Sequence, residues 1–463
     1  MSNTGCFRSF RSPGFRDTLR IMSTRKRYAV VGVGGRSKMY VKALASTHRE
    51  HGELVALCDP NSVRLEYANE QLSEEFGAKP VATYSPRDFE TMISRERVDT
   101  VIVTSIDRTH HDYIVRAMEA GCDAISEKPM TVDAEKCSAI NDAIRRTGKN
   151  LTVTFNYRYA PRNSRVKEVL LSGAIGEIKS VHFEWLLDTS HGADYFRRWH
   201  RDKRNSGGLM VHKATHHFDL VNWWINSTPK SVFAVGDLVF YGKENAEKRG
   251  LTEFYDRSTG NSIARRDPFA LHMDSKEKLR RTYLEAEHED GYRRDQSVFS
   301  DGISIEDDMS VLVRYNSGAS MTYHLTAYSP WEGFRIAFNG TKGRLEYNVT
   351  EVSYISTSDS DIHGEQAIDK KGHPADIPAE LVLHRHWQEP EYIPFEQTDE
   401  SGHGGGDTRL LNDLFIGGER DPLGRAADHV AGTDSILTGI AANIAMAEKR
   451  PVDVNELRNR VQG

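Results

Sequence analysis

Short apolar runs alternate with longer segments of helical periodicity in the first third of the chain, between residues 28 and 147. The short runs predict buried strands at 28–33, 53–59, 98–105 and 122–128. The segment 111–121 carries apolar residues on one helical face and ends at Gly121, a residue type that often closes a helix. Alternating strands and helices are typical of a parallel sheet. We therefore predict a doubly wound α/β domain over residues 25–150.

The pattern changes after residue 150, where strand-like segments are spaced further apart. They lie at 151–159, 178–187, 310–328 and 334–347. Two of them contain turn sequences, 316–318 and 340–343, which favour antiparallel hairpins. A glycine-rich hinge at 401–411 precedes a closing helix at 432–449. These features predict a second, α+β domain over residues 151–463 with an antiparallel or mixed sheet.

A charged segment between about 242 and 300 interrupts this second domain, with one helical stretch near 275–287. An insertion of such length is usually functional or disordered. The first 24 residues are expected to form a disordered tail. Because the stretch 1–27 holds seven cationic residues and one acid, mitochondrial targeting is an alternative role for this tail.

Composition narrows the functional classes. The chain has 61 Lys and Arg against 67 Asp and Glu, so its formal net charge is -6, and it has no long basic run. We therefore expect no nucleic-acid partner. Four cysteines are scattered without CxxC spacing, and no apolar run approaches the roughly 20 residues that span a bilayer. This composition favours a cytoplasmic protein with no membrane partner.

The sequence "VGVGGRS" (31–37) lies between the first predicted strand and a helical pattern, the context of a dinucleotide-binding loop. The residues expected to contact the cofactor there are Gly32, Gly34, Gly35, Arg36 and Ser37. Ser37 departs from the third glycine of GxGxxG, and an ordinary glycine turn is the alternative interpretation. Asp59 ends the second strand, where its carboxylate is placed to accept hydrogen bonds from the adenosine ribose. This carboxylate favours NAD over NADP, although Arg36 and Arg64 leave NADP possible.

"SEKP" (126–129) follows the fourth predicted strand. Lys128 is expected to face the ligand crevice at the carboxyl end of the sheet, where its ammonium could polarise a carbonyl or hold an alcohol. Glu127 is an anionic partner for Lys128 in this interpretation.

Together with "TSIDRTHHDY", "AMEAG", "GG…HxxxHHFD" and "GTKGRLE", these segments resemble the Gfo/Idh/MocA family of oxidoreductases over about residues 25–350 and the closing helix. The resemblance implies an N-terminal Rossmann domain and a C-terminal α+β domain with a large, open, mostly antiparallel sheet. It also implies that the protein assembles as a homodimer or homotetramer. The implied activity is that of a sugar dehydrogenase or a related oxidoreductase. Lys128 would contact both substrate and nicotinamide, with Thr104, Ser105 and His110 near the cofactor.

"SGGLMVHKATHHFDLVNWW" (206–224) supplies the candidate proton carriers. His212, His216 and Asp219 fall on one stripe if the segment is a single helix. His216 aligns with the family's catalytic histidine, and His212 replaces its usual aspartate. An imidazole can exchange a hydroxyl proton while nicotinamide exchanges a hydride. Either histidine could do this, and Tyr157 is a third candidate.

A metal site is the competing interpretation of this segment. His212, His216 and Asp219 could ligate zinc or manganese, with His403 as a further ligand. Proton transfer is favoured, so no metal is predicted. His217 is expected to be packed or hydrogen-bonded.

The substrate class is suggested by the polar and aromatic stretch 188–208. Trp199 offers a flat face for a polyhydroxylated ring, and Tyr157 and Asp219 are further expected contacts, whereas Arg197 and Arg198 leave an acidic sugar open. The leading hypothesis is an NAD(P)-dependent dehydrogenase or reductase acting on a secondary alcohol or ketone of a sugar, glycoside or cyclitol. A glycosidase or lyase that uses bound NAD without net redox, and a non-catalytic NAD-binding sensor, are the alternatives.

Overall fold

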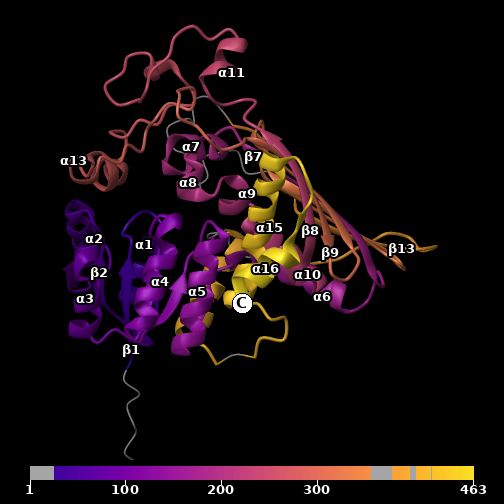
Figure 1. The fold of residues 1–463 in the computed structure, drawn as a ribbon, viewed down its shortest axis with the longest axis horizontal. Helices are drawn as coiled ribbons and strands as arrows, with labels where there is room; N and C mark the ends of the chain where they lie inside the picture. The colour runs from indigo at the N-terminus through magenta and orange to yellow at the C-terminus, as the bar shows by residue number, and fades with distance from the viewer. Residues whose placement is uncertain (1–24, 356–377, 397–402, 419, 463) are drawn as a thin grey trace, which may run out of the picture.

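The computed structural model of the chain describes residues 25–355, 378–396, 403–418 and 420–462. The predicted tail at 1–24 and the first residues of the predicted hinge, 401 and 402, lie outside the described residues. Two sheets organise the fold, a parallel one near the N-terminus and a larger one in the rest of the chain (Figure 1).

The first sheet is six-stranded, parallel, and ordered β3-β2-β1-β4-β5-β6. Its strands are β1 (Lys26–Val31), β2 (Gly52–Cys58), β3 (Ala82–Tyr84), β4 (Thr100–Val103), β5 (Asp123–Ser126) and β6 (Leu151–Val153). The prediction that the second domain begins at 151 is wrong by one strand, because β6 pairs with β5. The apolar run at 151–153 carried no signal that distinguished a last parallel strand from a first antiparallel one.

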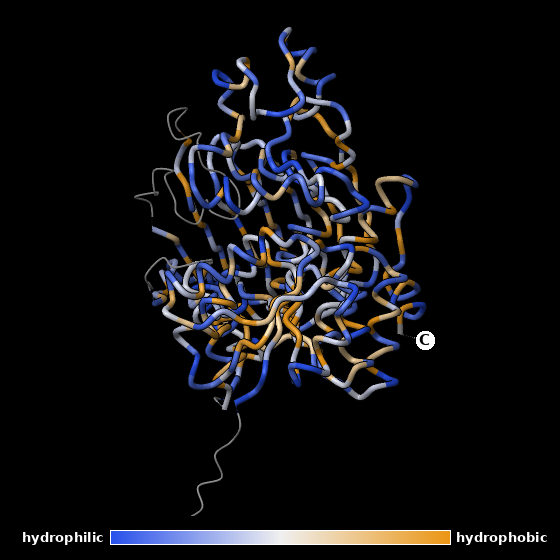
Figure 2. The backbone as a smooth tube through the Cα atoms, turned by 90° about the vertical axis from the view of Figure 1, so that its left-hand side faces the viewer, coloured by the Kyte–Doolittle hydropathy of each residue, from blue (hydrophilic) through white to orange (hydrophobic). Residues whose placement is uncertain are grey.

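Helices cover both faces of this sheet, as a doubly wound fold requires. They are α1 (Ser37–Lys42), α2 (Ser62–Glu74), α3 (Phe89–Glu96), α4 (His110–Glu119) and α5 (Ala134–Thr147). Strand β1 shows the division, since Tyr28 and Val30 join the cluster with α1 and α2 while Ala29 and Val31 join the cluster with α3, α4 and α5. Figure 2 shows hydrophobic segments concentrated in the interior of the molecule.

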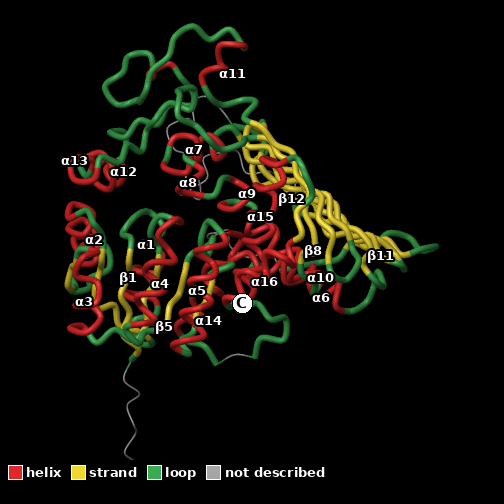
Figure 3. The backbone as a smooth tube through the Cα atoms, in the orientation of Figure 1, coloured by secondary structure: helices red, strands yellow, loops and turns green. Residues whose placement is uncertain are grey.

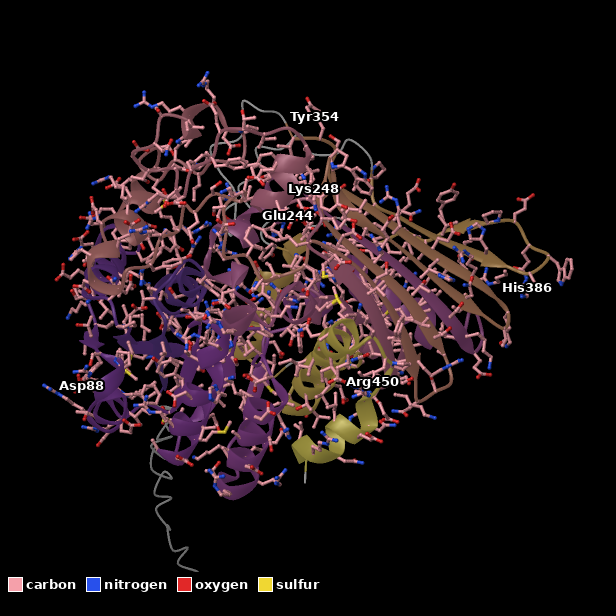
Figure 4. All side chains as sticks on the ribbon, turned by 45° about the horizontal axis from the view of Figure 1, so that its top comes forward. Asp88, Glu244, Lys248, Tyr354, His386 and Arg450 are labelled. Carbon is pink, nitrogen blue, oxygen red and sulfur yellow. The ribbon has the colours of Figure 1, made fainter. Side chains whose placement is uncertain are left out.

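The second sheet has nine strands in the order β14-β13-β12-β11-β7-β10-β9-β8-β15. They are β7 (Ile178–Asp188), β8 (Pro229–Asp237), β9 (Asp308–Tyr315), β10 (Ser320–Ser329), β11 (Glu332–Gly340), β12 (Gly343–Val352), β13 (Glu380–Arg385), β14 (Glu391–Tyr392) and β15 (Val452–Asp453). Only β7 and β10 pair in parallel among its described pairs. The sheet is therefore mixed but mostly antiparallel, as predicted, and its β13–β14 hairpin extends outward with His386 at the turn (Figure 4).

Helices pack on one side of the large sheet, between it and the first domain (Figure 3). The main ones are α6 (Pro161–Leu171), α9 (Leu209–His212), α10 (Thr215–Ile225), α15 (His429–Glu448) and α16 (Val454–Gln462), with shorter α7 (His191–Arg197) and α8 (Lys203–Ser206) near the end of β7. Helix α15 is long and apolar enough to cross a membrane by length and composition alone. The prediction that no apolar run has this length is therefore wrong. Here α15 packs against β8 and α10, and its central residues are buried.

The charged insertion extends from the second domain back to the first. It contains α11 (Lys243–Lys248), α12 (Glu277–Leu279) and α13 (Glu287–Asp290), and α13 lies beside α2 (Figure 1). Asn61 donates to the carbonyl of Ala286 at 2.8 Å, and Arg281 pairs with Glu70 at 2.6 Å. The insertion, predicted to be functional or disordered, is therefore a strap held across the end of the parallel sheet.

The C-terminal part of the chain also returns to the first domain. Helix α14 (Gly406–Phe415) places Phe415 edge-on against Tyr28, with ring centroids 5.2 Å apart. His48 and Asn412 are hydrogen-bonded nearby at 2.9 Å. Residues from the end of the chain thus complete the core on one face of the parallel sheet.

Candidate active site

One large cavity lies between the carboxyl ends of the parallel strands and the second sheet, with a volume of about 1220 Å³. This exceeds the roughly 300–1000 Å³ of a typical small-molecule pocket, so it has room for a dinucleotide and a substrate together. Most predicted site residues line it: Gly32, Gly34, Gly35, Arg36, Asp59, Thr104, Ser105, His110, Glu127, Lys128, Tyr157, Trp199, His212 and His216. Ser37 and Asp219 are not among its lining residues.

The glycine loop has the geometry that a diphosphate requires. Gly32 has φ +85, and a Cβ there would lie 2.5 Å from the backbone of Ser105, so only glycine fits. A Cβ on Gly34 would meet nothing within 4 Å, which leaves this part of the backbone open to a ligand. Ser37 donates to the carbonyl of Gly34 at 2.7 Å and so stabilises the loop from outside the cavity.

Asp59, the predicted ribose contact, follows β2 and lines the cavity. Its two oxygens accept from the backbone N–H groups of Val33 at 2.7 Å and Asn61 at 2.9 Å, which fixes the carboxylate against the loop. Burial raises the pKa of Asp59, whereas Arg64 acts in the opposite direction. Among the described residues, the buried Nη2 of Arg64 has no hydrogen-bond acceptor, and a ribose oxygen would supply one.

The two arginines that left NADP open are already paired with carboxylates. Arg64 contacts Asp290 of the strap at 2.5 Å and lies 3.8 Å from Asp59. Arg36 contacts Glu127 at 2.6 Å and Asp407 at 3.5 Å. Two carboxylates around each guanidinium leave excess negative charge, which opposes a 2'-phosphate.

Glu127 has two stronger partners besides the predicted Lys128. Its Oε1 accepts from Arg36 and from the hydroxyl of Tyr40, both at 2.6 Å. Burial alone would raise the pKa of Glu127, but Arg36, Tyr40 and the charge of Lys128 together lower it. The carboxylate therefore links the glycine loop to the end of β5.

The loops after β4 and β5 are joined by His110. Its Nδ1 lies 2.8 Å from the carbonyl oxygen of Pro129, and its Nε2 lies 3.0 Å from that of Ser105. Thr104 donates to the carbonyl of Gly32 at 2.6 Å. These contacts hold three cavity-lining loops in one arrangement where the nicotinamide end of a cofactor would lie.

Lys128 and His212 converge in this cavity. The ammonium of Lys128 donates to the carbonyl oxygen of His212 at 3.3 Å. The Nδ1 of His212 lies 2.5 Å from a carboxylate oxygen of Asp107, which follows β4. Among the described residues, His212 Nε2 has no hydrogen bond, so this nitrogen is available to a ligand. A cation and a carboxylate-oriented imidazole thus meet beside the glycine loop.

The charge state of His212 follows from its surroundings. Burial, reinforced by the positive charges of Lys128 and Arg198, lowers the pKa of His212 well below its ordinary value. A neutral imidazole is therefore present at neutral pH. With Nδ1–H donating to Asp107, the lone pair is on Nε2, so His212 can accept a proton.

The histidine segment is not the single helix that its periodicity predicted. Helix α9 ends at His212 and α10 begins at Thr215, and glycines with positive φ, Gly207 and Gly208, precede α9. His216 consequently faces a different wall, stacked on Tyr157 with centroids 4.4 Å apart and planes 14° apart. His217 is packed on Trp185 and hydrogen-bonded to Tyr323 at 2.7 Å, in agreement with its predicted structural role.

Asp219 is the predicted substrate contact that the structure contradicts. Its carboxylate is 1% exposed and accepts two hydrogen bonds from Arg158, at 2.7 and 2.5 Å. Burial favours such a bidentate pair, and no signal in the sequence linked these two residues. Paired with Arg158, Asp219 is not placed as a metal ligand beside His212 and His216, and a search of the described residues finds no group of three or more His, Cys, Asp or Glu side chains that could hold a metal ion. His403's side chain lies outside the description.

The far end of the cavity is aromatic. Trp199 stacks on His200 with centroids 3.5 Å apart, and Trp185 lies beside Tyr157 at 6.0 Å. Burial raises the pKa of Tyr157 well above its ordinary value, so this phenol stays protonated at neutral pH. Tyr157 can therefore donate a hydrogen bond, and its role as a third candidate proton carrier stays a prediction.

Sequence reasoning missed several groups that line this end. Asp107 follows a strand in "SIDRTHH", where position alone was a usable signal. Lys213 lies between the two histidines and was treated as part of the helix. Asp188 and Glu332 come from different strands, β7 and β11, and share a hydrogen bond; their pairing depends on sheet register and was not predictable.

The fold and the site define a two-domain dinucleotide-dependent oxidoreductase, with a Rossmann domain and a catalytic domain on a large mixed sheet. Comparison with known families agrees. Residues 26–155 match the oxidoreductase-family NAD-binding Rossmann fold, and residues 167–454 match the family's C-terminal alpha/beta domain. The chain belongs to the Gfo/Idh/MocA oxidoreductase family, and its N-terminal domain binds NAD.

Individual proteins are similar to this chain over different lengths. The Bacillus subtilis protein "Putative oxidoreductase YteT" is 35% identical over 93% of this chain and 98% of its own length. The D-glucoside 3-dehydrogenase of Escherichia coli is 33% identical over 34% of this chain and 42% of its own length. Among solved structures, the WlbA dehydrogenase of Bordetella pertussis in complex with NADH and UDP-GlcNAcA has a TM-score of 0.58 and 16% identity, covering 93% of this chain and 99% of that one.

Proposed function

We propose that this protein catalyses NAD-dependent oxidation of a secondary alcohol, or the reverse reduction, on a small polyhydroxylated compound such as a sugar, glycoside or cyclitol. The observation that carries the proposal is the meeting of Lys128 with the Asp107–His212 pair in one cavity beside the glycine loop. The glucoside dehydrogenase activity named for one relative supports the substrate class.

Each side chain has a distinct task. Lys128 would donate a hydrogen bond to the reacting oxygen and stabilise negative charge on it. His212 Nε2 would accept the hydroxyl proton, and the Asp107 carboxylate would stabilise the resulting imidazolium. Bound NAD would supply the hydride acceptor. Trp199 and Tyr157 would flank the sugar ring.

The test is a screen of sugars, cyclitols and their keto forms against the NAD-loaded protein, following the absorbance of reduced nicotinamide. Wild-type protein should form NADH with at least one alcohol, and Lys128→Met should lower that rate by about 10²-fold or more. NAD binding without turnover of any compound would instead favour the sensor alternative.

A second candidate is glycoside cleavage assisted by transient oxidation, and one pair of residues favours it. Burial and the neighbouring Glu332 raise the pKa of Asp188 to about 8, so Asp188 is a carboxylic acid at neutral pH within the same cavity. Such an acid could protonate a leaving glycosidic oxygen. Release of the aglycone without net NADH would identify this activity.

The oligomeric state and the cellular location of the protein stay predictions. We expect a homodimer or homotetramer formed through the large sheet and a cytoplasmic location. The exposed side chains of Phe233 and Leu312, paired across β8 and β9 on the outer face, are consistent with an interface there.

A further inference from the structure

Lys213 has a position that the proposed catalytic steps do not use. It lies in the break between α9 and α10, directly after His212, and lines the same cavity. The residue is 5% exposed. Among the described residues, its ammonium makes no hydrogen bond or ion pair. It lies 5.0 Å from the ring centroid of Trp185 and 5.9 Å from that of Tyr157.

A buried ammonium without an anionic partner is costly, because desolvation is not offset by a Coulombic contact. Burial accordingly lowers the pKa of Lys213 to about 8, which still leaves it mostly charged at pH 7. Cation–π contact with Trp185 offsets part of the cost. A ligand that placed a negative charge beside the ammonium of Lys213 would offset most of the remaining desolvation cost.

The acidic side chains near Lys213 are already engaged. Glu332 contacts His191 at 2.8 Å and shares a hydrogen bond with Asp188, and Glu351 pairs with Arg162. Both carboxylates raise the pKa of Lys213 through their charge, and neither forms an ion pair with it among the described residues. Lys213 therefore carries a positive charge at the cavity wall, and no described acidic side chain neutralises it by direct contact.

The wall beside Lys213 is aromatic. Trp185 lines the cavity, and the ammonium of Lys213 lies 5.0 Å from its ring centroid. A buried ammonium beside an aromatic ring still lacks an anionic partner, and an anionic group with several acceptor lone pairs would satisfy it. A carboxylate on a sugar is such a group.

We propose that the substrate is an acidic sugar or a glycoside of one, and that its carboxylate is bound by Lys213; this proposal rests on the proposed dehydrogenase function. The adjacent position of His212 then places the oxidised carbon close to the carboxylate-bearing part of the ring. Lys213 is a substrate-binding residue in this arrangement, while His212 and Lys128 act on the reacting oxygen.

The experiment uses NAD-loaded, full-length protein and matched ligands that differ only in charge. The pairs are methyl glucosiduronic acid with methyl glucoside, and methyl galactosiduronic acid with methyl galactoside. Calorimetric titration measures binding and nicotinamide absorbance measures turnover. At least one acid should bind about tenfold or more tightly than its neutral partner.

The variant Lys213→Met keeps the length and apolar stem of the side chain and removes its charge. It should weaken binding of the acid tenfold or more and change binding of the neutral partner less than twofold. Lys213→Arg should keep part of the preference. Lys230→Met, an exposed lysine on β8, is the matched control and should change neither ligand.

Affinity for the acid should also fall above about pH 8, because Lys213 loses its proton and Asp188 ionises in the same cavity over this range. Only the Lys213 part of this fall should disappear in Lys213→Met. The proposal is overturned if no acid binds better than its neutral partner, or if Lys213→Met weakens both partners equally. Selective binding of an acid without NADH formation would contradict the dehydrogenase function alone. NADH formation from neutral sugars only would contradict the present inference alone.

Discussion

The two histidines that looked equivalent in the sequence differ in what holds each ring. Asp107 orients His212 through Nδ1, whereas His216 is stacked on Tyr157. A carboxylate partner fixes the tautomer of an imidazole and stabilises its protonated form. At the scale of single residues, His212 is thus the better proton acceptor, although His216 matches the family pattern.

Replacing Asp107 with asparagine tests this assignment. The side chain keeps its size but loses the charge that stabilises a protonated His212, so kcat should fall by about 10²-fold or more with KM little changed. Steady-state kinetics on any alcohol found in the screen would measure this. His212→Asn should have a similar effect and His216→Asn less than a tenfold effect. A larger loss from His216→Asn than from His212→Asn would reverse the assignment.

The pH dependence of oxidation gives an independent check. Because burial lowers the pKa of His212 below 6.5, its neutral, proton-accepting form is complete at pH 7 and persists as the pH falls through 6.5. The kcat/KM for oxidation should therefore stay level between pH 7.5 and 6.5 and decline only at lower pH. If kcat/KM instead falls with a midpoint at or above pH 6.5, the proton acceptor is a group other than the buried His212.

At the scale of elements, the strap formed by the insertion lies beside the predicted adenosine end of the cofactor site. Its residues Tyr283, Asp290 and Tyr292 line the cavity, and its backbone accepts hydrogen bonds from Asn61 and Arg64 at the start of α2. Part of the predicted cofactor site therefore comes from the second domain. We expect cofactor choice to depend on this strap as well as on the glycine loop.

Asp290→Asn would remove one of the two carboxylates that surround Arg64. The guanidinium would then attract a 2'-phosphate, so affinity for NADP should rise by about tenfold while affinity for NAD changes little. Fluorescence titration with each reduced cofactor gives both constants. Glu253→Gln, an exposed acid elsewhere in the insertion, is a suitable control. Unchanged NADP affinity would mean that Asp59 alone sets the preference.

Local sequence patterns predicted the helices and strands well, but they did not predict which residues of distant segments contact each other. Strand β1 and Gly32 were predictable because a short, continuously apolar strand and a glycine turn leave direct marks in the sequence. The break at Lys213 was not, since α9 and α10 together keep helical spacing of apolar residues. Asp219 with Arg158, and Asp188 with Glu332, are pairings between distant segments, and hydrophobic periodicity carries no information on which polar groups will meet.

At the scale of the whole molecule, the two sheets share one cavity and exchange segments. The strap extends from the second domain over α2, and α14 returns to cover the opposite region of the parallel sheet. Asn156 and Asp407 are hydrogen-bonded at 2.6 Å between the end of the first domain and the start of α14. Stability of the cofactor domain should therefore depend on residues near the C-terminus.

Phe415→Ala measures that dependence. Phe415 is buried and contacts Tyr28 and His48, so its truncation should reduce the free energy of unfolding by about 2–4 kcal/mol. Urea denaturation monitored by circular dichroism would give the value, and Ile416→Ala, at an exposed neighbouring position, should cost less than 1 kcal/mol. A negligible effect of Phe415→Ala would show that α14 is only loosely attached.

The contact between Tyr28 and Phe415 joins the first strand of the nucleotide-binding region to a helix that comes much later in the chain. A chimaera of two relatives that exchanged only the early segment would take these two residues from different parents. Such a chimaera should be less stable than either parent wherever the two side chains no longer fit each other. The nucleotide-binding region is therefore built from separated segments of the sequence, and a single cut cannot isolate it.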